Sequence, residues 1–489
     1  MFFAARVAWL LMFAIFGVSA SARASNGDDL NALLERMRAR NGPVWRAHLI
    51  STSTLSLSGI TGEMHSESSN LRFAAYQCAD DLCAGTYFDG ERSYEINING
   101  TTLPEAYASN TYLRGERTIA SLAFLDPNFT STGGRVADDG WATIAGTRYR
   151  KVLVSNGDAI PMHVFVDPVR YVVRYFGDVN GDGSVELRDY RNVDGGYYLP
   201  FEVLRDGKVS ERYHTRGSTS DVFTAPHGPL PVFTGKSTPI ATDPARAVPV
   251  FACTLGGIST TCLLDSGNSG LSISRELAQR LAAPRVGTYR IVGLGDYSTD
   301  VVRAGQLVVG NATFPAANYV ELNDIAPFGY QVVLGADVFA STTISLDPVA
   351  HTIAFGEPAP SSAIGVHLAF QDFLPIVTVQ LGTIGTQLAL DTGDESNINL
   401  AFDFYQQHHD LFSATEQRSV RGVGGTSVEM IGTIPLVRIG DLFVDHQRIG
   451  ATQTLHGTAF GHLGAQFLTN FNVMIDYATQ SAFFTPIRN

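Results

Sequence analysis

The chain has 489 residues, a length that corresponds to roughly three domains of typical size. Hydrophobic residues make up 45% of it and charged residues 17%, a balance that excludes an intrinsically disordered protein. The formal net charge of −13 argues against nucleic acid or an anionic membrane surface as a partner, because both require a basic face. Frequent Gly and short runs of β-branched and aromatic residues predict a mostly-β fold.

The first 24 residues have the pattern of an export signal. Arg6 precedes an apolar run at 7–18 that is too short to span a bilayer, and Ala22-Arg23-Ala24 has the form of a cleavage site. We therefore expect a signal peptide at 1–24 and a protein exported to the periplasm or the medium, with an uncleaved anchor helix as the alternative. No later stretch is long and apolar enough to cross a membrane, so we expect no integral membrane segment in the mature chain.

The sequence of residues 26–224 predicts a separate β-rich accessory domain. It begins with one amphipathic helix over Asp28–Arg40, and alternating strands follow at 149–154, 162–167 and 171–176. Polar turns separate these strands, which predicts an antiparallel meander in the form of a curved sheet or an open barrel. A Pro-rich linker at 225–237 then divides this domain from the rest of the chain.

A calcium loop is a weak candidate within this domain. Oxygen ligands at the spacing of an EF-hand loop would come from Asp178, Asn180, Asp182 and Asp189. An EF-hand also needs flanking helices, whereas residues 171–176 are strand-like. Asn180-Gly181 and Asp182-Gly183 are common hairpin turns, so a polar hairpin is the favoured interpretation.

Residues 238–360 and 361–489, called lobe 1 and lobe 2 below, contain an internal repeat. Asp265-Ser266-Gly267 recurs as Asp391-Thr392-Gly393 after an offset of 126 residues, and Gly335 recurs as Gly464 after 129. Each copy continues into an alternating strand that ends in an acid, at 344–347 and 473–476. Landmarks in the same order at nearly constant offset predict two similar β lobes.

The repeated Asp-Ser/Thr-Gly segments point to acid–base chemistry. An apolar strand would bring each carboxylate to the seam between the lobes, where Gly allows close approach and the hydroxyl can hydrogen-bond across the seam. Two neighbouring carboxylates in a low dielectric share one proton. One of them can then activate water while the other, protonated, supports the attacked carbonyl group.

These motifs resemble the retropepsin/pepsin-like aspartic proteases, here as a single chain of two lobes. The resemblance covers about half of the chain and implies Asp265 and Asp391 as the catalytic pair. It also implies that Ser266 and Thr392 interlock, and that Gly335 and Gly464 pack beneath the active-site loops. Asn268 and Asp394 depart from the Ala that is usual after the motif. His462, before Gly464, is expected to be a partly exposed histidine at the core edge, with a substrate-subsite residue as the alternative.

The resemblance also implies a Gly-rich flap in each lobe. The matching residues are Gly293, Gly295 and Tyr297 in lobe 1, and Gly422, Gly424 and Gly425 in lobe 2. Such hairpins can open for substrate and close to exclude water.

Four cysteines fit an oxidising compartment. Cys78 and Cys83 bracket a polar turn, and Cys253 and Cys262 flank a hairpin whose turn lies near Gly257. We expect a local disulfide in each pair, with free buried thiols as the alternative.

The sequence thus predicts an exported, monomeric aspartic endopeptidase that cleaves polypeptides without a metal or other cofactor. The alternative is an inactive relative that binds peptides or lipids, or serves as a scaffold, in the periplasm. It is favoured by the departures at Asn268 and Asp394 and by a loose resemblance of the N-terminal domain to LolA/LolB-like open β-barrels. Phe88-Asp89-Gly90 and Val166-Asp167-Pro168 are among the residues that carry this second resemblance, which implies a concave apolar face for an acyl chain or a peptide. A structural or pro-region-like role is the alternative for this domain.

Overall fold

The computed structural model describes residues 27–57, 60–79, 82–105, 107–179, 185–219, 239–292, 296–323, 325–359, 361, 363–422, 425–452 and 461–487. Strands make up 57% of the fold and helical segments 15%, which confirms the predicted mostly-β class. The expected signal peptide at 1–24 and the expected linker at 225–237 lie outside the described residues. Among the described residues, no helix has the length and apolar character needed to cross a membrane.

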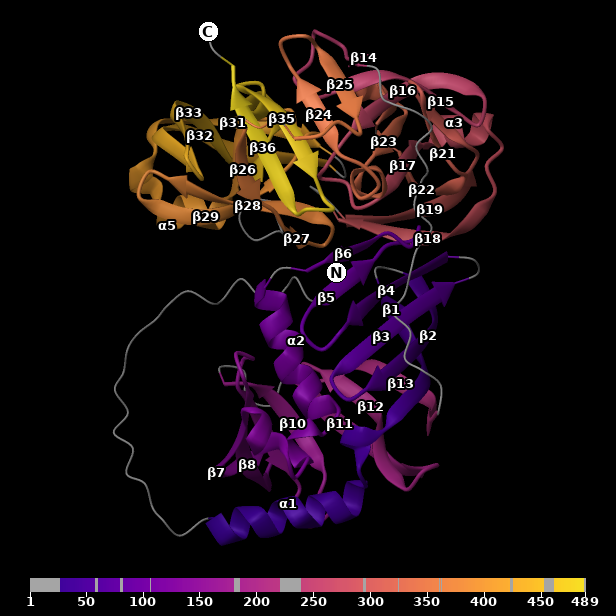
Figure 1. The fold of residues 1–489 in the computed structure, drawn as a ribbon, viewed down its shortest axis with the longest axis vertical. Coiled ribbons are helices and arrows are strands. Elements are labelled where there is room, and N and C mark those ends of the chain that lie inside the picture. Colours follow the sequence, from indigo (N-terminus) through magenta and orange to yellow (C-terminus); the bar gives the residue numbers. More distant parts are fainter. Residues whose placement is uncertain are drawn as a thin grey trace.

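One antiparallel sheet of thirteen strands forms the N-terminal part (Figure 1). Its order is β6-β5-β4-β3-β2-β1-β13-β12-β11-β10-β9-β8-β7, so nearly every strand pairs with its neighbours in sequence, as expected for a meander. The strands are β1 (His48–Leu57), β2 (Ile60–Ser69), β3 (Arg72–Ala79), β4 (Leu82–Phe88), β5 (Ser93–Ile96), β6 (Thr102–Pro104), β7 (Gly134–Ile144), β8 (Thr147–Asn156), β9 (Met162–Val166), β10 (Val173–Asp178), β11 (Val185–Val193), β12 (Tyr197–Arg205) and β13 (Lys208–Ser218).

Two helices pack against this sheet, whereas the sequence predicted one. The expected helix is α1 (Gly27–Asn41), which contacts β7 and β12. The additional helix, α2 (Tyr107–Ala120), contacts β5, β8 and β9. Met37 of α1 and Ile119 of α2 are buried in one core with Val152 of β8.

The polar segment that follows β10 lies in a strand–strand connection. β10 and β11 pair antiparallel, so the flanking elements are strands rather than the helices of an EF-hand. Asp189 lies on β11, where its carboxylate accepts hydrogen bonds from the Arg191 guanidinium. Asp178 ends β10, and Asn180 and Asp182 lie outside the described residues.

The C-terminal half contains two sheets with corresponding strand orders. Lobe 1 contains β22-β17-β23-β16-β15 and lobe 2 contains β33-β30-β34-β29-β28. The lobe 1 strands are β15 (Val250–Leu255), β16 (Ile258–Leu264), β17 (Leu271–Ser274), β18 (Arg285–Val292), β19 (Asp296–Ala304), β20 (Leu307–Val309), β21 (Ala312–Phe314), β22 (Ala317–Leu322) and β23 (Val332–Leu334). The lobe 2 strands are β27 (Ala369–Gln371), β28 (Leu374–Leu381), β29 (Ile384–Leu390), β30 (Ile398–Ala401), β31 (Ser413–Gly422), β32 (Gly425–Ile439), β33 (Leu442–Thr452) and β34 (Gly461–Leu463).

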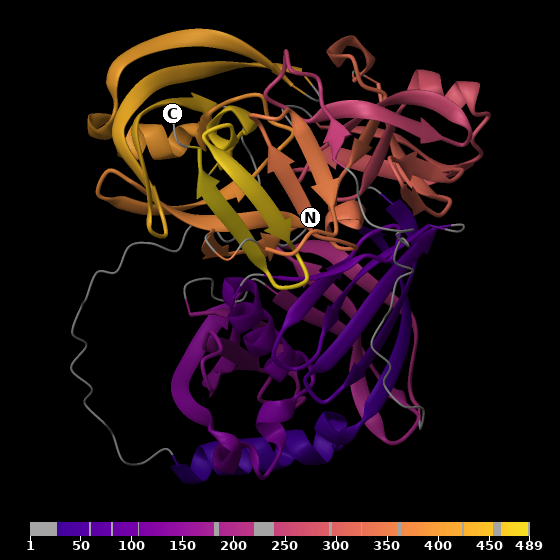
Figure 2. The same ribbon diagram turned by 45° about the horizontal axis from the view of Figure 1, so that its top comes forward.

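A third sheet joins the two lobes. Its order, β14-β25-β24-β35-β36-β26, places β24 of lobe 1 antiparallel to β35 of lobe 2, with Ile344 opposite Ile475. The repeated acid-ending strands thus pair with each other across the seam (Figure 2). The strands are β14 (Ile240–Ala241), β24 (Ile344–Asp347), β25 (Thr352–Phe355), β26 (Ile364–His367), β35 (Phe471–Asp476) and β36 (Ser481–Pro486).

Short helical segments complete the described fold. They are α3 (Arg275–Arg280), α4 (Ala336–Phe339), α5 (Phe402–Gln407), α6 (Ala465–Leu468) and the 3₁₀ turns η2 (Val44–Arg46), η3 (Ala123–Leu125), η4 (Phe129–Thr132), η5 (Ala326–Phe328) and η6 (His409–Leu411). The core of both lobes is continuous: Leu264 and Leu334 of lobe 1 belong to one buried cluster with Leu390 and Leu463 of lobe 2.

One of the two expected disulfides is present among the described side chains. Cys253 and Cys262 are bonded, with their Cα atoms 5.9 Å apart. They are diagonal rather than directly opposite, because the two-residue turn at Gly256-Gly257 pairs Cys253 with Thr260. Cys78 and Cys83 are opposite each other on β3 and β4, but their side chains lie outside the described residues.

Candidate active site

Asp265 and Asp391 occupy the same position in their two lobes. Each directly follows a strand, β16 for Asp265 and β29 for Asp391, and each strand pairs in parallel with a strand of the same lobe. The backbone N–H of Asp265 donates to Leu334 O over 2.9 Å, and that of Asp391 donates to Leu463 O over 3.0 Å. The backbone of both acids is therefore fixed by the sheet that precedes it.

Ser266 and Thr392 interlock across the seam. The Ser266 N–H donates to Thr392 Oγ1 over 3.0 Å, and the Thr392 N–H donates to Ser266 Oγ over the same distance. Each hydroxyl in turn donates to a carbonyl group of the other lobe, Ser266 to Leu390 and Thr392 to Leu264. Both side chains are completely buried, so this reciprocal network ties the two active-site loops together without solvent competition.

The two carboxylates lie against the glycine of the opposite motif. A Cβ placed on Gly267 would lie 2.5 Å from Asp391 Cγ, and one placed on Gly393 would lie 2.6 Å from Asp265 Oδ2. Each carboxylate also accepts a hydrogen bond from the glycine N–H of its own motif, over 2.8 Å in lobe 1 and 3.0 Å in lobe 2. The absence of a side chain at both positions lets the acids converge.

Gly335 and Gly464 pack directly against the active-site loops. Their N–H groups donate to Gly270 O and Asn397 O, each over 2.8 Å. A Cβ on Gly335 would lie 2.5 Å from Gly270 O, and one on Gly464 would lie 2.9 Å from Asp394 O. A larger residue at either position would displace the loop that carries the acid.

The surroundings of Asp265 and Asp391 act differently on the pKa values of the two acids. Burial raises the pKa of Asp265 well above its ordinary value, and the charge of Asp391 together with the hydrogen bond between the two carboxyl groups raises it further. Burial also raises the pKa of Asp391, but His462 opposes this rise. The surroundings therefore favour the protonated form of Asp265 over that of Asp391.

His462 contacts Asp391, one of the two paired acids (Asp265 and Asp391, called the dyad below). The sequence alone did not decide whether His462 would reach these acids. Its Nδ1 lies 3.2 Å from Asp391 Oδ2 and 3.5 Å from Asp394 Oδ2, and 20% of its side chain is exposed. Although burial acts to lower the pKa of His462, the hydrogen bond to Asp394 and the charge of Asp391 raise it to about 9. Burial acts to raise the pKa of Asp394, but its hydrogen bond with His462 brings the net value below normal.

Asp391, Asp394 and His462 also form a group whose ligand atoms lie within 4.8 Å of one another, close enough to hold a metal ion. The short contacts between the imidazole and both carboxylates are equally those of a protonated histidine in an ion-pair cluster. The sequence signal for this cluster is the position of His462 within the repeat. His462 precedes Gly464 by two residues, as Val333 precedes Gly335 in lobe 1, so the repeat alone could have placed a charged ring beside the dyad.

The segments expected to be flaps are hairpins in both lobes. β18 and β19 pair in lobe 1, with Tyr297 opposite Ile291, and β31 and β32 pair in lobe 2, with Gly422 opposite Gly425. Gly293, Gly295 and Gly424 lie outside the described residues.

The N-terminal part reaches lobe 1 beside the active-site loop, a contact that the sequence did not predict. Asn97 Nδ2 donates to Ser269 O over 3.0 Å and to Asp337 Oδ1 over 2.8 Å. Asp337 is 2% exposed and also accepts hydrogen bonds from Asn99 and Thr101. Burial raises the pKa of Asp337. Leu82 of β4 packs on β18, where a Cβ on Gly287 would lie 2.8 Å from its Cδ2.

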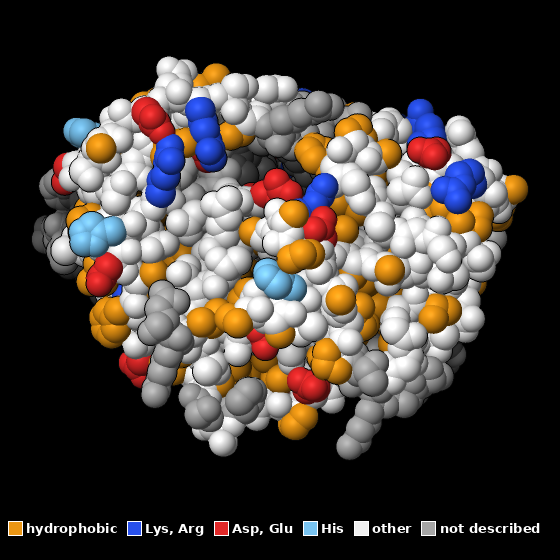
Figure 3. Space-filling view, turned by 90° about the horizontal axis from the view of Figure 1, so that it is seen from above, with side chains coloured by type: hydrophobic (Ala, Val, Ile, Leu, Met, Phe, Trp, Pro, Cys, Tyr) orange, Lys and Arg blue, Asp and Glu red, His pale blue; other side chains and the backbone are white. Residues whose placement is uncertain are grey.

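A cavity of about 250 Å³ lies in lobe 2 next to the active-site loop. Ser396 and Gln466 line it on the side of the loop, and Arg418 with its partner Glu429 lines it on the side of the β31–β32 hairpin. The face of the lobes seen in Figure 3 is hollowed, with basic and acidic side chains on the rim of the hollow.

No protein-family model matches the chain, and no characterised protein matches its sequence. The resemblance to aspartic proteases therefore rests on the residues of the repeat.

Proposed function

We propose that the two lobes form an aspartic endopeptidase with Asp265 and Asp391 as its catalytic residues. The observation that carries this proposal is the reciprocal Ser266–Thr392 network, which holds each carboxylate against the glycine of the other lobe. An isolated Asp-Thr-Gly turn needs no such partner. Two interlocked copies with a hydrogen bond between their acids are suited to sharing a proton over a bound substrate.

The unequal acids support a division of roles. Asp391, whose ionised form is favoured by His462, takes a proton from a water molecule as the water oxygen attacks the carbonyl carbon of the scissile peptide. Asp265 donates its proton to the carbonyl oxygen, giving a neutral tetrahedral diol. The proton held by Asp391 then passes to the amide nitrogen while Asp265 recovers a proton from the diol, and the C–N bond breaks. These steps require neither a covalent intermediate nor a cofactor.

The substrate in this proposal is a polypeptide in an extended conformation. The hairpins β18–β19 and β31–β32 offer strands with which an extended chain can pair. The lobe 2 cavity beside Ser396 offers a place for a substrate side chain. The sequence pattern of residues 1–24 supports export, so we propose that the enzyme acts outside the cytoplasm as a monomer.

The experiment is a cleavage assay on a denatured protein substrate from acidic to neutral pH. Asp265→Asn and Asp391→Asn should each lower kcat by roughly 100- to 10,000-fold, because each removes one proton-transfer group. Asp403→Asn, at an exposed residue of α5, is the matched control and should retain full activity. Full activity in both dyad variants would refute the proposal.

A second candidate is an inactive relative that binds peptides or lipids between the lobes. Asp394 favours it, because the acid stands where the resembled family has Ala and is engaged with His462 and Ser396. This candidate predicts that a peptide binds to the wild type without being cleaved, and that Asp265→Asn leaves the affinity unchanged.

A further inference from the structure

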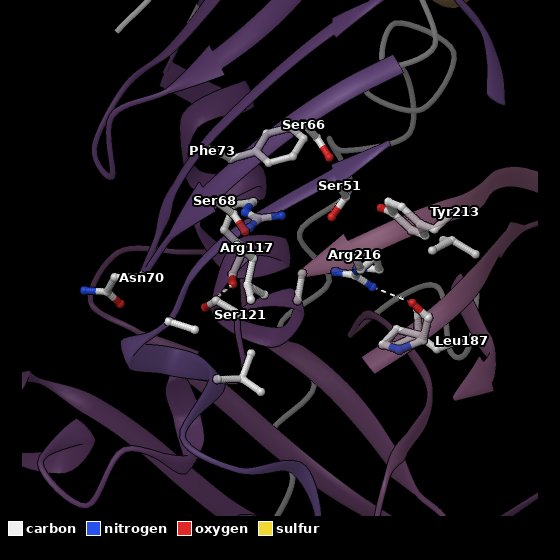
Figure 4. A pocket seen from close by; sticks show the side chains of 16 residues that line it. Ser51, Ser66, Ser68, Asn70, Phe73, Arg117, Ser121, Leu187, Tyr213 and Arg216 are labelled. Atoms are coloured by element: carbon white, nitrogen blue, oxygen red, sulfur yellow. Dashed lines mark hydrogen bonds between the residues drawn. The ribbon is translucent and has the colours of Figure 1, made fainter. Parts of the chain in front are cut away.

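A second cavity lies inside the N-terminal sheet, far from the dyad in sequence (Figure 4). It measures about 70 Å³ and is lined by residues of η2, β1, β2, β3, β11, β12, β13 and α2. Among the described residues that line it, two are arginines, Arg117 and Arg216, and none is acidic. The cavity therefore carries a concentrated positive charge in a protein whose net charge is −13.

Strand register explains why polar groups gather on this face. Ser51 of β1 is directly opposite Arg216 of β13 on one side and Ser66 of β2 on the other. Cross-strand partners project from the same face of a sheet, so these three side chains form one polar row. Ser68, two residues after Ser66, projects from that face as well and also lines the cavity. These polar side chains share the cavity with apolar ones, among them Leu49, Phe73 and Val203.

Both guanidinium groups have an N–H donor that makes no hydrogen bond within the described part of the chain. The Nε atoms of Arg117 and Arg216 are buried and have no hydrogen-bond partner. Arg216 donates through Nη1 to the carbonyl oxygen of Pro200. Each guanidinium also lies over an aromatic ring, Arg117 at 4.4 Å from the centroid of Phe73 and Arg216 at 4.3 Å from that of Tyr213.

The nearby acids are engaged with other residues. Glu116 pairs with Arg205, and Glu211 accepts a hydrogen bond from Tyr213. Among the described residues, neither cavity arginine forms an ion pair with a carboxylate. Burial lowers the pKa of Arg117, and the charge of Arg216 acts in the same direction, while Glu116, Tyr213 and Glu211 oppose it. Two like charges that share a partly buried cavity are less costly when an anion binds between them.

We propose that this cavity binds a compact oxyanion, a phosphate or carboxylate group, between Arg117 and Arg216. The planar guanidinium forks suit the oxygens of either group, and the hydroxyls of Ser51 and Ser66 lie in the same polar row to donate further hydrogen bonds. The small volume selects the oxyanion itself or the head of a longer molecule whose remainder lies outside. This site is independent of the proposed peptidase activity.

Isothermal titration of the full chain tests the site with two probes, inorganic phosphate and hexanoate, and with hexanol as the uncharged control. Binding of phosphate alone identifies a free or esterified phosphate, and binding of hexanoate alone identifies a carboxylate on an apolar tail. Arg117→Gln and Arg216→Gln should each weaken binding of the active probe by at least about tenfold, because each removes charge-assisted hydrogen bonds.

Arg212→Gln is the matched control, because Arg212 lies on the same strand as Arg216, is exposed and pairs with Glu202. It should bind like the wild type. Ser66→Ala, which leaves both charges in place, should weaken binding by a smaller factor and serves if an arginine variant fails to fold. Absence of binding to both anions at millimolar concentration, or equal affinity in the wild type and all cavity variants, would overturn the proposal.

Discussion

The contact between Gly267 and Asp391 gives a quantitative test of the paired carboxylates. In Gly267→Ala the new methyl group would lie 2.5 Å from Asp391 Cγ. Carbon atoms in ordinary contact are about 3.5–4.0 Å apart, so the carboxyl group must move by roughly 1 Å. Misplacement of a catalytic group by about 1 Å costs on the order of 100-fold in rate. We therefore expect kcat to fall by about two orders of magnitude.

The assay is steady-state cleavage of an unfolded protein substrate, with circular dichroism to verify that the variant is folded. Gly385→Ala is the matched control. Gly385 lies on β29, the strand that ends before Asp391, and a Cβ there meets no atom within 4 Å. If the Gly267→Ala variant cleaves the substrate as fast as the Gly385→Ala variant and the wild type, then Asp391 does not act from its position against Gly267, and the reasoning is refuted.

Two further variants test the surroundings of the dyad. In His462→Gln, loss of the cation beside Asp391 raises the pKa of Asp391, so the acidic limb of the kcat/KM–pH profile should move to higher pH; an unmoved limb would exclude this role. Because the pKa of His462 rises from 6.5 to about 9 on folding, its stabilisation is fully present below pH 6.5 and lost as the pH rises through about 9. The stability difference between wild type and His462→Gln in urea unfolding should decline over that range. Thr392→Val leaves Leu264 O and Ser266 N–H buried without partners and should cost roughly 2–5 kcal/mol in urea unfolding, whereas Thr378→Val, at an exposed site, should be neutral.

The repeat made the centre of the site predictable from sequence. Asp265 and Asp391 follow apolar strands at equivalent positions of the repeat. The hydroxyl group next to each acid is close enough to the seam between the lobes to hydrogen-bond across it. Such features depend on local pattern and on symmetry, which a sequence carries directly. The positions of Gly335 and Gly464 follow from the same register.

Contacts between distant and unrepeated segments were not predictable in this way. Asn97 and Asp337 are 240 residues apart, and neither segment has a sequence pattern that predicts contact with the other. Helix α2 was missed because Gly115 lies in its middle, where Gly disfavours a helix by about 1 kcal/mol. The structure supplies the reason for that glycine: a Cβ there would lie 2.5 Å from Ile160 O and 2.8 Å from Met162 Cε. Tertiary packing overrides local propensity at this position.

The most direct test of the paired acids is a titration of peptide cleavage with a statine-type inhibitor, whose hydroxyl group takes the place of the attacking water. If Asp265 and Asp391 share a proton over the substrate, one equivalent of inhibitor should abolish cleavage by the wild type, and Asp265→Asn should bind it far more weakly. Cleavage that persists at saturating inhibitor, or equal binding to wild type and Asp265→Asn, would contradict a catalytic site built from these two carboxylates.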